Sequence, residues 1–416
     1  MSLEENSEGL TVPSWASTVL VRATLQGVGF GSGSADGARV ANVTFSAAAS
    51  PGDSYCSALL RATAELEGAQ GHGGAQTVLL KGPPAGAAAA AAVAQGGHFR
   101  RETIMLTQLV PKMEALLEAA APGRFPPLAA RCPLHGRRPV HFLVLQDLRP
   151  LGFQPAQRRR GLGLRHCLLA LRTLARYHAA SAALLAREPA AAAAARALGN
   201  PMRPGGPATF GPFVEASLRL AAAACRAWPG FREYADLLDA LRPGALEAFA
   251  ALLDPAPGRF SVVAHGDFWL NNMLFRYERG RPVDMRMVDF QISCVASPAI
   301  DLLYFFSTSP SEDVSSRHED LLLREYHVAL RDTMELLGLQ APPLEALQAA
   351  LDAHGAFALF GATGVLPLVK VDAAPDVNAT AGGDADAGAF MYEEPAVKAW
   401  LQRVLPEYKR RGWLRL

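Results

Sequence analysis

The residues best suited to chemistry lie in two short segments, His265 to Asn272 (HGDFWLNN) and Met287 to Gln291 (MVDFQ). Phosphoryl transfer to an alcohol needs a carboxylate that orients the hydroxyl and accepts its proton, together with oxygen ligands for Mg²⁺ at the phosphates. Asp267 suits the first role, and Asn272 and Asp289 suit the second. The ordered set therefore indicates ATP- and Mg²⁺-dependent phosphoryl transfer, with Asp267 as the catalytic base.

Short strands must position these side chains. Asp267 follows the apolar run that starts at Ser261, and two further strand-like runs, joined by a hairpin turn over Glu278 to Asp284, return the chain to Asp289. The alternative is that His-Gly-Asp is a simple turn and that Asp289 caps a local element. The fixed order of the three residues on a strand, loop, strand, strand frame favours the functional interpretation.

The first part of the chain predicts a small sheet. Two runs, at 56–66 and 75–81, flank a glycine-rich stretch and predict an antiparallel hairpin. A helix is expected over 99–117, interrupted or bent by Pro111, and a strand over 141–148. The connector that follows contains Arg158 to Arg160, which we interpret as a solvated face.

The second part is mainly helical in pattern. Helices are predicted over 163–187, 213–228 and 233–253, and residues 355–369 read as a buried helix ending at Pro367. The predicted class is α+β, with a small β-rich N-terminal lobe over 1–145, a larger helical C-terminal lobe over 146–416 and a linker near residues 145–155. A nucleotide cleft between the lobes is expected.

Composition excludes several classes of function. The 40 Lys and Arg nearly cancel the 39 Asp and Glu, which is unsuited to binding nucleic acid or an anionic membrane surface. The five cysteines form no C-x-x-C pair, so neither a zinc site nor a disulfide framework is indicated. The first 15 residues lack the pattern of a signal peptide, and no apolar run reaches the roughly 18 residues of a membrane span. We expect a cytoplasmic protein with no nucleic-acid or membrane partner.

Several segments together resemble one known family. Besides the two segments above, they are GDSYCSALLRATAEL from Gly52, FRRE from Phe99, LVLQDL from Leu143, LARYHAAS from Leu174 and LPEYKRRGWL from Leu405. From about Gly52 onward, the chain resembles the protein-kinase-like phosphotransferases, and more closely the ecdysteroid-kinase-like (CHK kinase-like) group, related to choline and aminoglycoside kinases. The resemblance implies a bilobal protein-kinase-like fold that uses ATP and Mg²⁺.

The resemblance also implies roles for individual residues. Lys81 would contact the α- and β-phosphates and Glu102 would pair with it, where the alternatives are a solvated lysine and a surface helix charge. His265 and Asp301 would brace the catalytic loop, although Asp301 could simply be an acid at a helix start. The other residues implied at the nucleotide are Ser54 and Tyr55 in a turn over the phosphates, and Leu145, Gln146, Asp147 and Leu148 at the hinge, through backbone groups.

The chain departs from the protein-kinase pattern in three places. No G-x-G-x-x-G precedes Lys81; the turn Gly52 to Ser57 stands in its place, and the glycine cluster at 27–37 reads as a flexible loop. The metal-binding triplet is Asp-Phe-Gln, so the glycine that lets regulated kinases flip this segment is missing. No Ala-Pro-Glu signature or activation loop follows. A protein substrate is therefore not expected.

The expected partner is a small-molecule alcohol. Aromatic residues within 210–234 and 357–368 are candidates for its pocket, although such residues are more often core. Mainly on the resemblance, the acceptor is expected to be neutral and partly apolar, an ecdysteroid or other steroid-like compound. A choline- or aminoglycoside-type kinase and a catalytically weak nucleotide-binding scaffold remain alternatives. His178 is interpreted as a packed structural histidine, and the sequence leaves the acceptor, its hydroxyl and the oligomeric state open.

Overall fold

The computed structural model describes residues 12–27, 39–48, 57–67, 74–84, 87–138, 140–203, 210–371 and 388–415. The chain divides into two compact units, one of Met1–Ala94 with Ala130–Gly152 and one of Gln95–Ala129 with Phe153–Leu416. The expected lobes were 1–145 and 146–416. In the structure, residues 95–129 belong with the second unit because helix α4 (Val110–Ala120) packs on helix α5 (Leu164–Arg187) of that unit.

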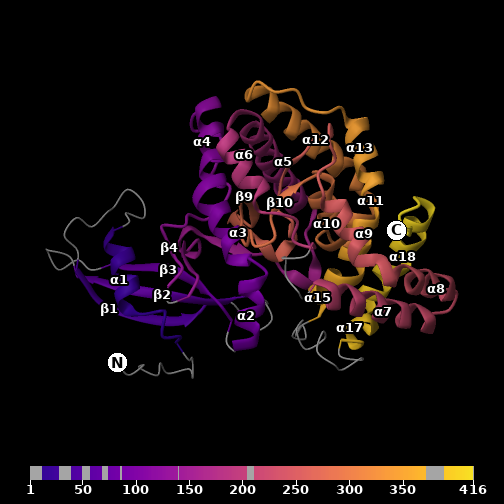
Figure 1. Cartoon of the computed structure of the whole chain (residues 1–416), viewed down its shortest axis with the longest axis horizontal. Helices are drawn as coiled ribbons and strands as arrows, with labels where there is room; N and C mark the ends of the chain where they lie inside the picture. The colour runs from indigo at the N-terminus through magenta and orange to yellow at the C-terminus, as the bar shows by residue number, and fades with distance from the viewer. Residues whose placement is uncertain are drawn as a thin grey trace. The chain divides into compact units, whose positions relative to one another are not determined.

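The first unit is built on one antiparallel sheet, drawn in indigo to violet in Figure 1. Its order in the described part of the chain is β1-β2-β3-β5-β4. The predicted hairpin is confirmed, since β2 pairs with β3 and Leu59 lies opposite Lys81. The elements are α1 (Thr18–Gly27), β1 (Arg39–Ala47), β2 (Ala58–Glu67), β3 (Ala75–Gly82), α2 (Ala87–Gln95), β4 (Leu134–Gly136) and β5 (Phe142–Gln146).

Alternate residues of the central strands form the core of this unit. Val78 and Leu80 of β3 are fully buried and pack in one cluster with Val144 of β5 and with Trp15. Every second residue is buried because successive side chains of a strand point to opposite faces of the sheet. Gly82 is required at the end of β3, because a Cβ there would lie 2.2 Å from the Trp15 ring. The indole thus packs directly on the backbone next to Lys81.

The second unit is mainly helical, as predicted, and α5 packs along α12 in it (Figure 1). Its helices are α3 (His98–Ile104), α4 (Val110–Ala120), α5 (Leu164–Arg187), α6 (Pro189–Arg196), α7 (Phe210–Ala227), α8 (Arg232–Leu241), α9 (Ala245–Leu253), α10 (Ala299–Thr308), α11 (Glu312–Arg317), α12 (Glu319–Leu336), α13 (Leu344–Ala353), α14 (Ala356–Phe360), α15 (Leu366–Lys370), α17 (Phe390–Glu393) and α18 (Pro395–Arg410).

Two prolines are accommodated by wide helical turns. Before Pro111, the chain makes a π-helical turn over Met105–Leu109 and then continues as α4, so the proline does not end the helix. The same device, a π turn over Gly361–Val365, precedes Pro367, and the helix runs on to Lys370. The expectation that this buried helix ends at Pro367 was wrong, because proline is tolerated in the first turn that follows a locally rewound segment.

The strands of the second unit carry the candidate chemistry. Strands β6 (Phe153–Pro155), β8 (Met273–Glu278) and β9 (Arg281–Met287) form one sheet, and β7 (Val262–Ala264) pairs antiparallel with β10 (Cys294–Ala296). The β8–β9 turn is shorter than predicted. It is Arg279-Gly280, both with positive φ (50° and 73°), as a two-residue hairpin whose twist matches its strands requires.

The basic connector is tied to the end of α15. Arg158 and Arg159 donate to the carbonyl oxygens of Val371 and Lys370 at 2.7 and 3.1 Å. They therefore satisfy carbonyls at a helix C-terminus, where a positive charge is also favoured. Arg159 and Arg160 are exposed, in line with the interpretation of this run as a solvated face, whereas Arg158 is partly buried.

No single helix of the described ranges is both long and apolar enough to span a membrane. One pair, Leu344–Ala353 with Ala356–Lys370, meets that test together and is bent by 58° at its break.

Candidate active site

Strand β7 leads into the first of the two candidate catalytic segments. Its three residues are fully buried, and it ends directly before His265, Gly266 and Asp267. Gly266 has φ +84°, and a Cβ there would lie 2.5 Å from the Ile292 carbonyl oxygen, so only glycine allows the chain to turn at this point. A 3₁₀ turn over Leu270–Asn272 leads into β8. The predicted strand-loop-strand frame is thus confirmed.

The structure brings Asp267 and Asn272 together. Oδ2 of Asp267 accepts a hydrogen bond of 2.7 Å from Nδ2 of Asn272, which also donates to the Asp267 backbone carbonyl at 2.9 Å. Because Nδ2 must face two acceptors, the amide orientation is fixed, and its Oδ1 is the oxygen left for a cation.

Tyr304 contacts the other oxygen of the same carboxylate. Its hydroxyl donates to Oδ1 of Asp267 at 2.6 Å. Burial raises the pKa of Asp267 to about 6; the hydrogen bonds from Tyr304 and Asn272 oppose the rise, and the negative charge of Asp289 adds to it. A carboxylate with a pKa near neutrality is a suitable proton acceptor for general base catalysis.

Asp289 follows β9 by two residues and has a backbone φ of +66°. This left-handed conformation is strained for most residues, and aspartate is among those that tolerate it. The electrostatic influence of Asp289 reaches both Asp267 and His265. The hairpin therefore brings this carboxylate back to the catalytic segment, as the sequence predicted.

The donor set fits magnesium. Asn272 supplies an amide oxygen and Asp289 a carboxylate, and Mg²⁺ prefers a few protein oxygens together with water and phosphate oxygens. No cluster of three or more His, Cys, Asp or Glu side chains that could hold a metal ion occurs within the described ranges. A metal here would thus depend on the amide oxygen and on the phosphates of a bound nucleotide.

Asp301 braces the catalytic loop from α10. It is fully buried, and its carboxylate accepts the backbone N–H groups of His265 and Gly266 at 2.7 and 2.8 Å. His178 Nε2 lies 2.9 Å from the same carboxylate, and its Nδ1 contacts the Tyr326 hydroxyl at 2.7 Å. Asp301 therefore makes tertiary contacts that an acid at a helix start would not make. His178 is a packed histidine, and it contacts the loop indirectly, through Asp301.

His265 holds the two catalytic segments together. Its Nε2 lies 3.1 Å from the carbonyl oxygen of Val288, next to Asp289, and its Nδ1 accepts the Asp267 N–H at 3.3 Å. Burial lowers the pKa of His265 by disfavouring the cation, although the charges of Asp301 and Asp289 act in the opposite direction. A neutral ring matches one donating and one accepting nitrogen.

Two residues of the predicted nucleotide site are buried. Lys81, near the end of β3, is 5% exposed, and Glu102 on α3 is fully buried, so neither is the solvated charge that the alternative interpretation required. Buried charges are retained when they are paired. The two residues belong to different units, and their pairing with each other stays a prediction.

The predicted hinge residues lie at the end of β5. Leu145 pairs with Leu79 of β3, and the Gln146 N–H donates to the Arg131 carbonyl at 2.8 Å. Asp147 and Leu148 are buried. Their predicted contacts with adenine remain predictions.

Asp147 has a structural role through its side chain. Its carboxylate accepts from Arg61 Nε of β2 at 2.7 Å and from the Arg149 N–H at 3.1 Å. Burial would raise the pKa of Asp147, but these hydrogen bonds and the positive charge of Arg61 hold it below its ordinary value. Ser54 and Tyr55, predicted at the phosphates, and the glycine cluster beyond Gly27 lie outside the described residues.

An aromatic cluster adjoins Tyr304, whose hydroxyl donates to Asp267. The Tyr304 ring lies 6.3 and 6.0 Å, between centroids, from Phe357 and Phe360, and Phe360 lies 5.9 Å from Phe213 of α7. Phe357 and Phe360 are buried, whereas Phe213 and its neighbour Phe210 are partly exposed. The two segments expected to wall an acceptor pocket therefore meet at Phe360, next to the Tyr304 ring.

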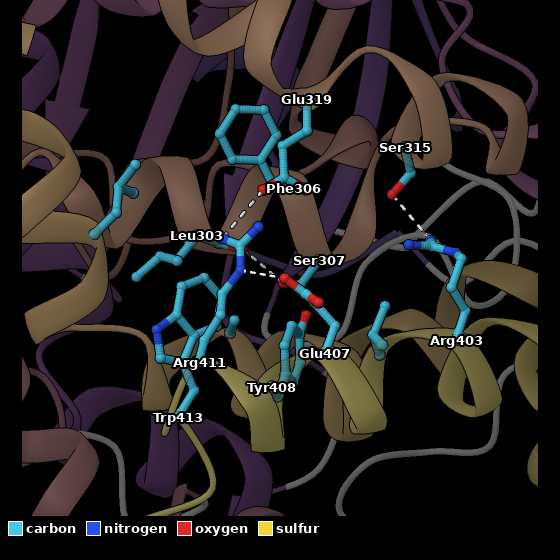
Figure 2. A pocket seen from close by; sticks show the side chains of 13 residues that line it. Leu303, Phe306, Ser307, Ser315, Glu319, Arg403, Glu407, Tyr408, Arg411 and Trp413 are labelled. Atoms are coloured by element: carbon cyan, nitrogen blue, oxygen red, sulfur yellow. Dashed lines mark hydrogen bonds and ion pairs between the residues drawn. The ribbon is translucent and has the colours of Figure 1, made fainter.

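A cavity of about 50 Å³ lies elsewhere against α10 (Figure 2). Leu303, Phe306 and Ser307 line it from α10, and the C-terminal helix lines it with Tyr408. Its charged groups pair with one another, since Arg411 contacts Glu407 and Glu319. This volume holds only a few waters, and its lining excludes Asp267, Asn272 and Asp289, so it is not the acceptor site.

Tyr304 is the site residue that sequence reasoning missed. It follows Asp301 by three positions in α10, and residues three apart share a helix face. Because Asp301 was expected next to the catalytic loop, Tyr304 could have been predicted to lie near that loop as well.

Comparison with known proteins gives one family match and two similar solved structures. A family model described as the ecdysteroid kinase-like family matches residues 51–339. A search of curated proteins finds no match. Among solved structures, the chain is similar to the aminoglycoside phosphotransferase APH(3'')-Id from Streptomyces rimosus, with 17% identity, 70% of this chain and 89% of that chain covered and a TM-score of 0.31. The same protein in complex with ADP and streptomycin matches with 15% identity, coverage of 69% and 90% and a TM-score of 0.30.

Proposed function

Because this chain belongs to the ecdysteroid kinase-like family, we propose that it is an ATP-dependent small-molecule kinase that phosphorylates an alcohol, with Asp267 as catalytic base. The observation that carries the proposal is the Asp267 carboxylate, held between Tyr304 and Asn272 with a second carboxylate, Asp289, close enough to raise its pKa. This reaction requires a group that accepts a proton and oxygen ligands that bind a cation.

In the proposed step, the acceptor hydroxyl oxygen attacks the γ-phosphorus of ATP. A new O–P bond forms, the bond from the γ-phosphorus to the β–γ bridging oxygen breaks, and its electron pair leaves with ADP. The hydroxyl proton passes to the carboxylate of Asp267. Because the base is held by two donors before the acceptor arrives, little reorganisation is needed during the reaction.

The proposed cofactor is Mg²⁺ with ATP. Asn272 and Asp289 would hold the ion, which when bound neutralises charge on the bridging phosphates. The hydrogen bonds of Nδ2 turn the Asn272 amide oxygen away from Asp267 and leave it for this purpose. Lys81, Glu102, the backbone over 145–148, and Ser54 with Tyr55 are the proposed nucleotide contacts.

The proposed acceptor is a neutral, partly apolar alcohol such as an ecdysteroid or other steroid-like compound. The aromatic cluster around Tyr304 supports this choice, because the partly exposed rings of Phe210 and Phe213 offer apolar surface and pack on Phe360, whose ring contacts Tyr304. Aromatic rings also bind cations, so choline belongs among the compounds tested. The cytoplasm, where ATP and Mg²⁺ are available, is the proposed location.

The test is transfer of labelled phosphate from Mg-ATP to a panel of steroid, sugar, choline and aminoglycoside alcohols. Asp267→Ala should lower the rate about 10²- to 10⁴-fold and leave Mg-ATP affinity nearly unchanged, since the base acts on the acceptor. Asp289→Ala should weaken Mg-ATP binding as well as turnover, since it is assigned to the metal. Asp332→Ala, a solvent-exposed aspartate on α12, is the matched control and should behave as wild type.

The outcomes separate the alternatives. A product that wild type forms and Asp267→Ala does not would support the kinase and name its acceptor class. Equal losses of ATP affinity and rate in Asp267→Ala would contradict its role as base. A wild-type protein that binds Mg-ATP but labels no compound in the panel would favour a nucleotide-binding scaffold, and one that does not bind Mg-ATP would refute the proposal.

A further inference from the structure

The hydroxyl of Tyr304 is held in a fixed place inside the second unit. Its residue is 3% exposed on α10, one turn after Asp301, which is itself fixed by hydrogen bonds to the catalytic loop. The Tyr304 ring packs against Phe357 and Phe360. Aromatic side chains packed in this way have little rotamer freedom.

Small residues fix the distance between α10 and the helix that carries those two rings. A Cβ at Gly361, directly after Phe360, would lie 2.1 Å from Oγ of Ser307 on α10. The backbone of the π turn over Gly361–Val365 therefore lies directly against α10. On another side, the lining of the cavity in Figure 2 places Leu303 and Phe306 next to α18. The helix that presents the Tyr304 hydroxyl is thus supported on more than one side.

The carboxylate of Asp267 is held at both oxygens by donors from different elements. Oδ1 accepts from Tyr304 of α10 at 2.6 Å, and Oδ2 accepts from Asn272 of the 3₁₀ turn at 2.7 Å. Each carboxylate oxygen offers about two acceptor sites, so both keep capacity for a further donor. Without the Tyr304 hydroxyl, the Asn272 amide and a weaker interaction with the Trp269 indole would be left to restrain the carboxylate group, and its plane could rotate more freely about the Cβ–Cγ bond.

We propose that Tyr304 is a positioning residue for phosphoryl transfer, which fixes the orientation of the Asp267 carboxylate so that an unused acceptor site faces the incoming hydroxyl. This inference rests on the proposed function. Tyr304 takes no proton and touches no reacting atom in this role. Its contribution is to preserve the attack geometry, and displacements of about 1 Å in such groups lower rates by about 10²-fold.

The test variant is Tyr304→Phe, which removes one buried hydroxyl and keeps the ring in its aromatic cluster. Tyr177→Phe on α5 is a matched control, because Tyr177 is also fully buried and its hydroxyl makes no hydrogen bond within the described residues. Both variants are first compared with wild type by thermal unfolding. Turnover is then measured as transfer from labelled Mg-ATP to the best acceptor of the panel, and as release of labelled phosphate with water as acceptor.

We expect Tyr304→Phe to lower kcat about 10- to 100-fold and to leave KM for Mg-ATP within about threefold of wild type. Tyr177→Phe should keep the wild-type kcat. The same Tyr304→Phe change made in the Asp267→Ala protein should lower turnover no further, because the group that it positions is already gone. A purely structural role would lower turnover by the same factor in both backgrounds.

Three results would overturn the inference. They are a folded Tyr304→Phe protein with wild-type kcat, a loss of the same size in the Asp267→Ala background, and a rise in KM for Mg-ATP that accounts for the whole effect. Each of them leaves the proposed function standing, because wild type still turns over and Asp267→Ala still lowers that rate about 10²- to 10⁴-fold. A wild-type protein that neither binds nor turns over Mg-ATP refutes the proposed function itself, and the inference falls with it.

Discussion

The brace at Asp301 allows a quantitative prediction. Among the described residues, its carboxylate accepts hydrogen bonds from the backbone N–H groups of His265 and Gly266 and from Nε2 of His178, all without exposure to solvent. Asp301→Asn keeps the shape but replaces one acceptor oxygen with an NH₂ group. In the less costly orientation, the amide oxygen serves His265 and His178, and the NH₂ group faces the Gly266 N–H.

The magnitude follows from these contacts. One buried N–H is left without an acceptor, which costs about 1–3 kcal/mol. Two hydrogen bonds to a charged acceptor become bonds to a neutral one, at a loss of roughly 1 kcal/mol each. The free energy of unfolding should fall by about 3–5 kcal/mol, a large part of the roughly 5–15 kcal/mol that stabilises a typical domain.

Guanidinium denaturation of wild type and Asp301→Asn measures this difference, with Asp313→Asn as control. Asp313 is 62% exposed and pairs with Arg317 on the same short helix, so its loss should change stability by less than about 0.5 kcal/mol. Hydrogen exchange should show faster exchange of the His265 and Gly266 amides in Asp301→Asn. A loss below about 1 kcal/mol, or unchanged protection of these two amides, would refute the reasoning.

Two further predictions concern other buried carboxylates. Burial raises the pKa of Asp267 from 3.8 to about 6, so the folded protein binds this proton more tightly than the unfolded chain; the stability contributed is full below pH 3.8 and is lost as the pH rises through about 6. In metal-free buffer, the unfolding free energy of Asp267→Asn relative to wild type should therefore rise by up to about 3 kcal/mol between pH 4 and 7, and a difference independent of pH would contradict this. Arg61→Met should destabilise the first unit by about 3–5 kcal/mol in chemical denaturation, because it leaves the carboxylate of Asp147, 2% exposed, without its cation. The control Arg276→Met breaks an exposed pair with Glu278 and should cost less than about 1 kcal/mol; equal effects of the two changes would show that the Asp147 pair is not important for stability.

The order of elements was largely predictable from the sequence, because strand and helix periods are local properties. The β2–β3 hairpin, the strand before Asp267 and the long helix α5 were all expected near their observed bounds. The continuation of the helix past Pro367 and the length of the β8–β9 turn were not predicted. A π turn and a two-residue loop depend on backbone angles, and a hydrophobic pattern does not specify these angles. The assignment of residues 95–129 to the second unit depended on packing against α5.

For the candidate site, the sequence by itself determined the chemical groups. Asp267, Asn272 and Asp289 were recognisable because their types and order match what phosphoryl transfer needs. Residue type and order can both be read directly from the linear sequence. Only the tertiary structure decided which groups surround them. Tyr304 and His178 lie 37 residues from Asp267 and 123 residues from Asp301, and no local rule connects residues at such separations. Their contacts arise because α5 packs on β7 and α10 lies against the loop that follows β7, and packing between distant segments is the information that a single sequence does not display.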